Sequence, residues 1–119
     1  MDIKPGIIII KSPDVLRAML EQRYAPLLIQ ILMGIVSDYG AVITSAYRDG
    51  DKGVHGHRRG IDLRSWCYYK ETARRIVGQI NAVWMYDPER LNKKCAMIHK
   101  VKNGAEHIHL QVHPHTRRR

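Results

Sequence analysis

The sequence predicts an α+β fold in which helices pack against a small, largely antiparallel sheet. Apolar residues recur at helical spacing between residues 15 and 36 and again between residues 69 and 84. Short β-branched or alternating runs lie mostly after the first of these regions. Helices that come first and are followed mainly by short strands are typical of α+β domains. With 119 residues, of which 45% are apolar, the chain is long enough for one domain with a single core.

The N-terminal region is expected to contain a strand and a helix. Residues 7–10 are all isoleucines, which predict a short buried strand. Ser12 followed by Pro13 is a helix-start signal, because Ser is a favourable N-cap and Pro suits the first helical position. Three residues would form the apolar face of this helix: Leu16, Met19 and Leu20.

A second helix is predicted to begin at Pro26, since apolar residues repeat at helical spacing after it. It is expected to end at Gly40, which suits a helix C-cap. Residues 41–44 then predict a strand. The stretch 48–60 is dense in Gly, Asp, Lys, Arg and His and is expected to be a loop.

The second half of the chain predicts one long helix and several short strands. Residues 61–63 have strand character, and residues 69–84 carry an apolar face at helical spacing. Residues 96–98 predict a further strand, and residues 102–104 predict a turn. In residues 107–112 polar and apolar side chains alternate, which is the pattern of a half-buried strand.

The chain carries a formal net charge of +9, which favours an anionic partner without specifying one. Residues 116–119 are expected to form a basic tail after a single domain of residues 1–115. Cys67 and Cys95 are too few for a disulfide framework and are expected to be reduced. No signal peptide or membrane span is visible in the sequence, so synthesis in the cytoplasm is expected.

The candidate functional residues are histidines that lie beside carboxylates in two separate segments. Residues 55–62 read His-Gly-His-Arg-Arg-Gly-Ile-Asp, and residues 106–109 read Glu-His-Ile-His. On a strand His107 and His109 would share one face, with Glu106 at the start of the strand. A catalytic zinc ion takes three N or O ligands from the protein and keeps one position open. Two His and one Asp meet this requirement.

These segments resemble the zinc D-Ala-D-Ala carboxypeptidases and L-alanyl-D-glutamate endopeptidases, which share their fold with the Hedgehog signalling domain. The resemblance rests on three motifs in order: Thr-Ser-Ala-Tyr-Arg at 44–48, a His and an Asp with six residues between them, and a Glu-x-x-His near the end. It covers residues 42–111, more than half of the chain. It implies a Hedgehog/DD-peptidase-like fold and cleavage of peptidoglycan peptides.

The resemblance also implies a role for each matching position. The zinc ligands would be the following residues: His55, Asp62 and His109. Glu106 would be the general base, with Arg48 stabilising the oxyanion and His107 as an auxiliary residue. Ser45 and Tyr47, which precede Arg48 in its motif, would contact the substrate.

One departure from the family pattern leaves a second alignment open. The family usually has Gly three residues after its first ligand, whereas this chain has Arg58 there, although Gly60 fits the next small position. If His57 were the ligand, Gly60 would lie three residues on, but Asp62 would then be only five residues away. His55 is preferred because the separation of His and Asp determines the metal geometry.

Three other classes of protein are compatible with the sequence. The basic composition and the Arg-rich segments would suit a nucleic-acid-binding protein or a metal-dependent nuclease. A protein that keeps the fold and the zinc without activity, such as a virion component, is the second alternative. The third is a protein with surface histidines and no metal. The preferred interpretation is a phage-like, endolysin-type peptidase that needs neither nucleic acid nor membrane and reaches the wall through a holin or on a virion.

Overall fold

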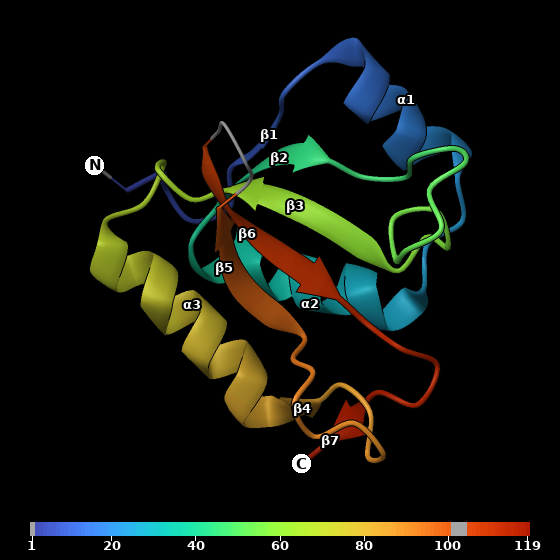
Figure 1. Cartoon of the computed structure of the whole chain (residues 1–119). Coiled ribbons are helices and arrows are strands. Elements are labelled where there is room, and N and C mark those ends of the chain that lie inside the picture. Colours follow the sequence, from blue (N-terminus) through green and yellow to red (C-terminus); the bar gives the residue numbers. More distant parts are fainter. Residues whose placement is uncertain (1, 101–104) are drawn as a thin grey trace.

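A five-stranded sheet with the order β1-β2-β3-β6-β5 forms the centre of the computed structural model, which describes residues 2–100 and 105–119 (Figure 1). The elements within these residues are β1 (Ile8–Ile10), α1 (Pro13–Glu21), α2 (Pro26–Asp38), β2 (Ala41–Ser45), β3 (Gly60–Arg64), α3 (Lys70–Val83), β4 (Trp84–Met85), β5 (Ala96–Lys100), β6 (Glu106–Gln111) and β7 (Arg117–Arg118). β1 pairs in parallel with β2, and the other neighbours in this sheet are antiparallel. The predicted α+β class with a largely antiparallel sheet is confirmed. The turn expected at 102–104 lies outside the described residues.

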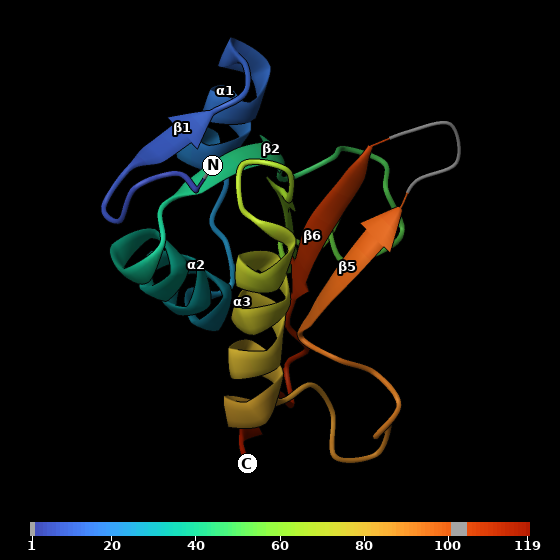
Figure 2. The same cartoon turned by 90° about the vertical axis from the view of Figure 1, so that its left-hand side faces the viewer.

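Helices α2 and α3 cover one face of the sheet (Figure 2). Strand alternation sends Ile61 and Leu63 of β3 and Ile108 and Leu110 of β6 towards these helices, where all four are fully buried. The helices contribute the other half of the core with these residues: Leu28, Ile31, Leu32, Ile35, Ala73, Ile76 and Ile80. The residues between them on β3 and β6 therefore point to the opposite face, which α2 and α3 leave free.

The helix boundaries follow the local signals in the sequence. The Ser12 hydroxyl accepts a hydrogen bond from the Val15 backbone N–H at 3.3 Å, as expected of an N-cap. Gly40 follows α2 with φ of +81°, and its N–H donates to the carbonyls of Ile35 and Val36. Only glycine adopts this left-handed conformation without strain, so Gly40 ends the helix as predicted.

The expectation of a buried N-terminal strand is wrong. Ile8 and Ile9 of β1 are 45% and 49% exposed. β1 is the outermost strand of the sheet, with a neighbour on one side only. The predicted apolar face of α1 is also largely unburied, since Leu20 is 76% exposed and only Met19 packs against the core. Apolar composition predicted the elements correctly, but it does not reveal which of them lie at the periphery.

The expected basic tail is held against the domain rather than extended from it. β7 pairs antiparallel with β4, so that Trp84 lies opposite Arg118. The Arg118 guanidinium lies 4.6 Å from the centre of the Trp84 ring, and the Arg119 N–H donates to the Val83 carbonyl. These contacts connect the C-terminus to the end of α3.

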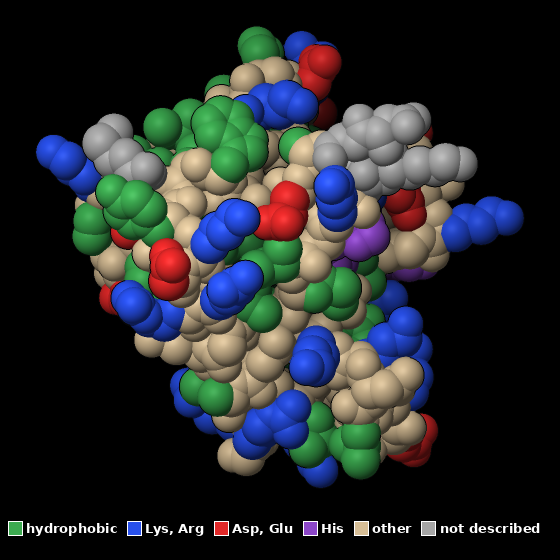
Figure 3. All heavy atoms as spheres, turned by 60° about the vertical axis from the view of Figure 1, so that its left-hand side comes forward, with side chains coloured by type: hydrophobic (Ala, Val, Ile, Leu, Met, Phe, Trp, Pro, Cys, Tyr) green, Lys and Arg blue, Asp and Glu red, His purple; other side chains and the backbone are tan. Residues whose placement is uncertain are grey.

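The surplus of positive charge is dispersed on the face drawn in Figure 3, where Lys and Arg side chains alternate with apolar and acidic ones. That face shows no single continuous basic patch. Within the described part of the chain, no helix combines the length and the apolar character needed to cross a membrane.

Candidate metal centre

Strands β3 and β6 place Asp62 directly opposite His109. The two residues are register partners in the antiparallel pair. Side chains of such partners project from the same face, and here it is the face turned away from the helices. The Asp62 carboxylate and the His109 ring therefore meet, with Oδ1 and Nδ1 2.7 Å apart.

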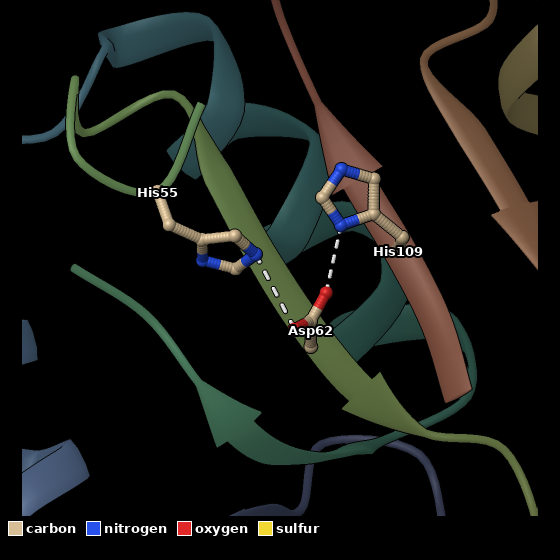
Figure 4. A group of neighbouring side chains, drawn as sticks. All are labelled: His55, Asp62 and His109. Atoms are coloured by element: carbon tan, nitrogen blue, oxygen red, sulfur yellow. Dashed lines mark hydrogen bonds and ion pairs between the residues drawn. The ribbon is translucent and has the colours of Figure 1, made fainter. Parts of the chain in front are cut away.

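His55 reaches the same point from the loop between β2 and β3 (Figure 4). Its Nε2 lies 3.3 Å from Asp62 Oδ2, and its ring centre lies 5.3 Å from that of His109. His55 and Asp62 are only 3% and 6% exposed. The structure thus brings together the three residues predicted as ligands, whereas His57 is exposed and belongs to no potential metal-binding group among the described residues.

Close backbone contacts fix the loop that carries His55. A Cβ atom at Gly56 would lie 1.6 Å from the Asp51 carbonyl oxygen, and one at Gly60 would lie 2.5 Å from a methyl group of Val54. Arg58 has a φ of 60°, in the left-handed region that favours glycine. Arg58 is also the position at which the zinc peptidases that the sequence resembles usually have Gly when His55 is the first ligand.

A backbone carbonyl orients the His55 ring. His55 Nδ1 lies 2.7 Å from the Ala46 carbonyl oxygen. Because a carbonyl can only accept, Nδ1 carries a hydrogen, and a ring that binds a metal ion would offer its electron pair at Nε2. This Nε2 is buried, faces the Asp62 carboxylate, and has no hydrogen-bond partner among the described residues. It is therefore available as a metal ligand.

The electrostatics of Asp62 agree with a site for positive charge. Burial raises the pKa of the Asp62 carboxyl, but hydrogen bonds and charge interactions from the facing His109 and His55 rings outweigh burial, and the net pKa lies well below the ordinary value. The carboxylate is therefore ionised. A cation bound at the site would replace the ring hydrogens that face the carboxylate. One donor atom from each of the three residues lies within 4.8 Å of the others. Two imidazole nitrogens and one carboxylate, with His55 and Asp62 buried and His109 partly buried, form a group that can bind a metal ion.

A cavity of about 460 Å³ opens at the three residues. Its wall also includes these side chains: Arg48, Lys93, Met97, His99, His107 and Gln111. The exposed Arg48 guanidinium is held by Asp51, with Nε and Oδ2 3.3 Å apart. His107 lies on the same face of β6 as His109, with its Nε2 3.6 Å from Asp62 Oδ1. Burial lowers the pKa of His107, although the nearby Asp62 carboxylate opposes this effect, and so favours the neutral ring.

The remaining predicted site residues lie farther from the three ligands. Glu106 is absent from the lining of the large cavity, because alternation along β6 turns it away from His107 and His109. It lines an adjoining cavity of about 260 Å³, together with Ser45, His107 and Asp62. Tyr47 lines neither cavity, and its hydroxyl donates to Asp49.

A second group of potential ligands, Asp87, His113 and His115, is satisfied by the protein itself. The Asp87 carboxylate accepts from the Glu89 N–H at 3.0 Å and from Arg90 at 2.9 Å. His113 Nδ1 accepts from the His115 N–H at 3.1 Å. These contacts occupy the Asp87 carboxylate and one nitrogen of His113, so fewer donor atoms remain for a metal ion in this group.

Sequence reasoning missed Gln111 as part of the centre. Its Oε1 lies 3.1 Å from His109 Nε2, and its amide NH2 donates to the Lys94 carbonyl at 2.7 Å. The alternation of β6 contains the signal, because Gln111 is two residues after His109 and shares its face. The carbonyls of Ala46 and Lys94 have no signal in the sequence, since any residue supplies a carbonyl.

The site thus defines the chain as a candidate mononuclear metal protein on an α+β scaffold. Searches of protein-family models, of curated proteins and of solved structures find no match to this chain. The resemblance to the zinc peptidases rests on the three sequence motifs alone.

Proposed function

We propose that the chain is a zinc-dependent peptidase that cleaves a peptide bond in the stem peptides of bacterial peptidoglycan. The convergence of His55, Asp62 and His109 at a cavity open to solvent carries this proposal. Two imidazole nitrogens and one carboxylate would leave a tetrahedral zinc ion one further position, as in catalytic rather than structural zinc sites. The order and spacing of the three motifs support the choice of peptidase and a Hedgehog/DD-peptidase-like fold.

The residues around the ligands suit the hydrolysis of a peptide bond. Zinc bound here would polarise the scissile carbonyl and make a bound water more acidic. Arg48 on the cavity wall can donate hydrogen bonds to the oxyanion that develops, because its guanidinium is exposed and already oriented by Asp51. We assign proton acceptance to Glu106 from its position three residues before His109 in the motif, although strand alternation turns it from the ligands and it lines the adjoining cavity. His107 lines both cavities and is the competing candidate for this role.

Peptidoglycan digestion by wild type, Glu106→Gln and Glu71→Gln tests the proposal. The amide of Glu106→Gln cannot take a proton from water, so we expect it to keep zinc and to lose hydrolysis by about 100- to 10,000-fold. Glu71 is an equally exposed carboxylate in the first turn of α3, and Glu71→Gln should match wild type in both respects.

The other outcomes separate the alternatives. Wild-type rates in Glu106→Gln would remove Glu106 from the mechanism and move the assignment to His107. A wild-type protein that binds zinc and cleaves no peptidoglycan would be a non-catalytic zinc protein. A wild-type protein that binds no zinc would refute the proposal and favour a basic nucleic-acid-binding protein.

A further inference from the structure

Gln111 is a nearly buried polar side chain, 9% exposed, at the end of β6 beside the proposed metal centre. A buried primary amide is unfavourable unless its donor and its acceptor both find partners. At Gln111 both are used, because Oε1 faces His109 and the NH2 group faces the Lys94 carbonyl. The amide therefore connects the backbone before β5 to a predicted metal ligand.

The direction of these hydrogen bonds follows from the Lys94 carbonyl. A carbonyl can only accept, so the Gln111 amide must turn its NH2 group towards Lys94. Its Oε1 is then directed at His109 Nε2 and can also only accept. A His109 ring that binds a metal ion has one hydrogen, which consequently lies on Nε2, and its electron pair lies on Nδ1, the nitrogen that faces Asp62.

We propose that Gln111 is a positioning residue that fixes His109 as an Nδ1 metal ligand. This inference rests on the metal centre of the proposed function. It assigns different nitrogens to the two histidines: Nε2 for His55, whose Nδ1 is bound to the Ala46 carbonyl, and Nδ1 for His109. A hydrogen-bond acceptor behind a ligand histidine orients the ring and strengthens the metal bond.

The zinc dissociation constants of wild type, Gln111→Met and Gln79→Met test this role in the full chain, by competition with a chromophoric chelator. Met matches Gln in size but offers His109 no acceptor, so we expect Gln111→Met to bind zinc about 10 to 100 times more weakly. Gln79 lies on α3, where its amide accepts from the Tyr39 hydroxyl, and Gln79→Met should bind zinc like wild type.

The ring nitrogens of the zinc-bound wild-type protein give a second test that needs no change at Gln111. In ¹⁵N-labelled histidine spectra, His109 should carry hydrogen on Nε2 and zinc on Nδ1, and His55 should show the reverse. A signal missing in His109→Ala identifies the His109 ring. Zinc on His109 Nε2, or an unchanged dissociation constant in Gln111→Met, would overturn the inference while leaving the metal centre intact. A wild-type protein without zinc affinity would overturn the proposed function, and this inference with it.

Discussion

Zinc should raise the melting temperature of the wild-type protein by about 10 °C, and His55→Ala should abolish this rise. The three ligands come from a loop, from β3 and from β6, so the unfolded chain does not hold them together. Zinc would therefore bind the folded state, and a free concentration about 100 times the dissociation constant would contribute about 2.7 kcal/mol to the free energy of unfolding. A domain of this size gains about 4 °C for each kcal/mol.

Thermal unfolding with zinc and with a chelator measures this shift for wild type, His55→Ala and His57→Ala. His57→Ala is the matched control, because it removes an exposed imidazole from the same loop. Its shift should equal that of wild type. The reasoning fails if His55→Ala and wild type shift equally, or if wild type does not shift. A loss of the shift only in His57→Ala would establish the alternative alignment of the first motif.

Three further predictions follow from the site and the core. Asp62→Ala should lose zinc and activity together, and elemental analysis beside Glu106→Gln, which should retain zinc, checks the difference. Arg58→Gly should have a free energy of unfolding in urea about 1 kcal/mol higher than that of Arg58→Ala, because only glycine adopts its backbone conformation without strain. Burial raises the pKa of the Cys95 thiol from 9.0 to about 11, so the thiol loses its proton at a lower pH in the unfolded chain than in the folded protein. The free energy of unfolding should therefore fall between pH 9 and 11, by less in Cys95→Ala, as measured by urea unfolding at each pH.

The sequence predicted most of the framework because its signals are local. The Ser12 N-cap, the glycine at the end of α2 and the alternation in β6 each act within a few residues. The grouping of His55, Asp62 and His109 was also predictable, because His55 and Asp62 lie close in the chain and His109 belongs to a recognisable motif. These features needed no knowledge of which elements pack together.

Features that depend on packing could not be predicted. The isoleucines of β1 have the composition of a central strand, and only the order of the sheet leaves them exposed at its edge. Glu106 has the sequence position of a general base. However, β6 pairs regularly with β5 from Lys100 and Glu106 onwards, so normal strand alternation directs Glu106 away from His109. Gln111 had no visible partner until the chain around Lys94 was placed beside it.

Because side chains alternate along β3 and β6, the hydrophobic core determines the alignment of the candidate metal ligands. Asp62 lies between Ile61 and Leu63, and His109 lies between Ile108 and Leu110, so each of these predicted ligands is flanked by two fully buried apolar residues. A shift of either strand by one position would drive a charged or polar ligand into the core and expose two large apolar side chains. Misaligned states are therefore eliminated by hydrophobic packing before any ion binds. An insertion or deletion of one residue within either strand should abolish folding and metal binding together. Length changes outside the two strands should preserve the alignment of β3 with β6.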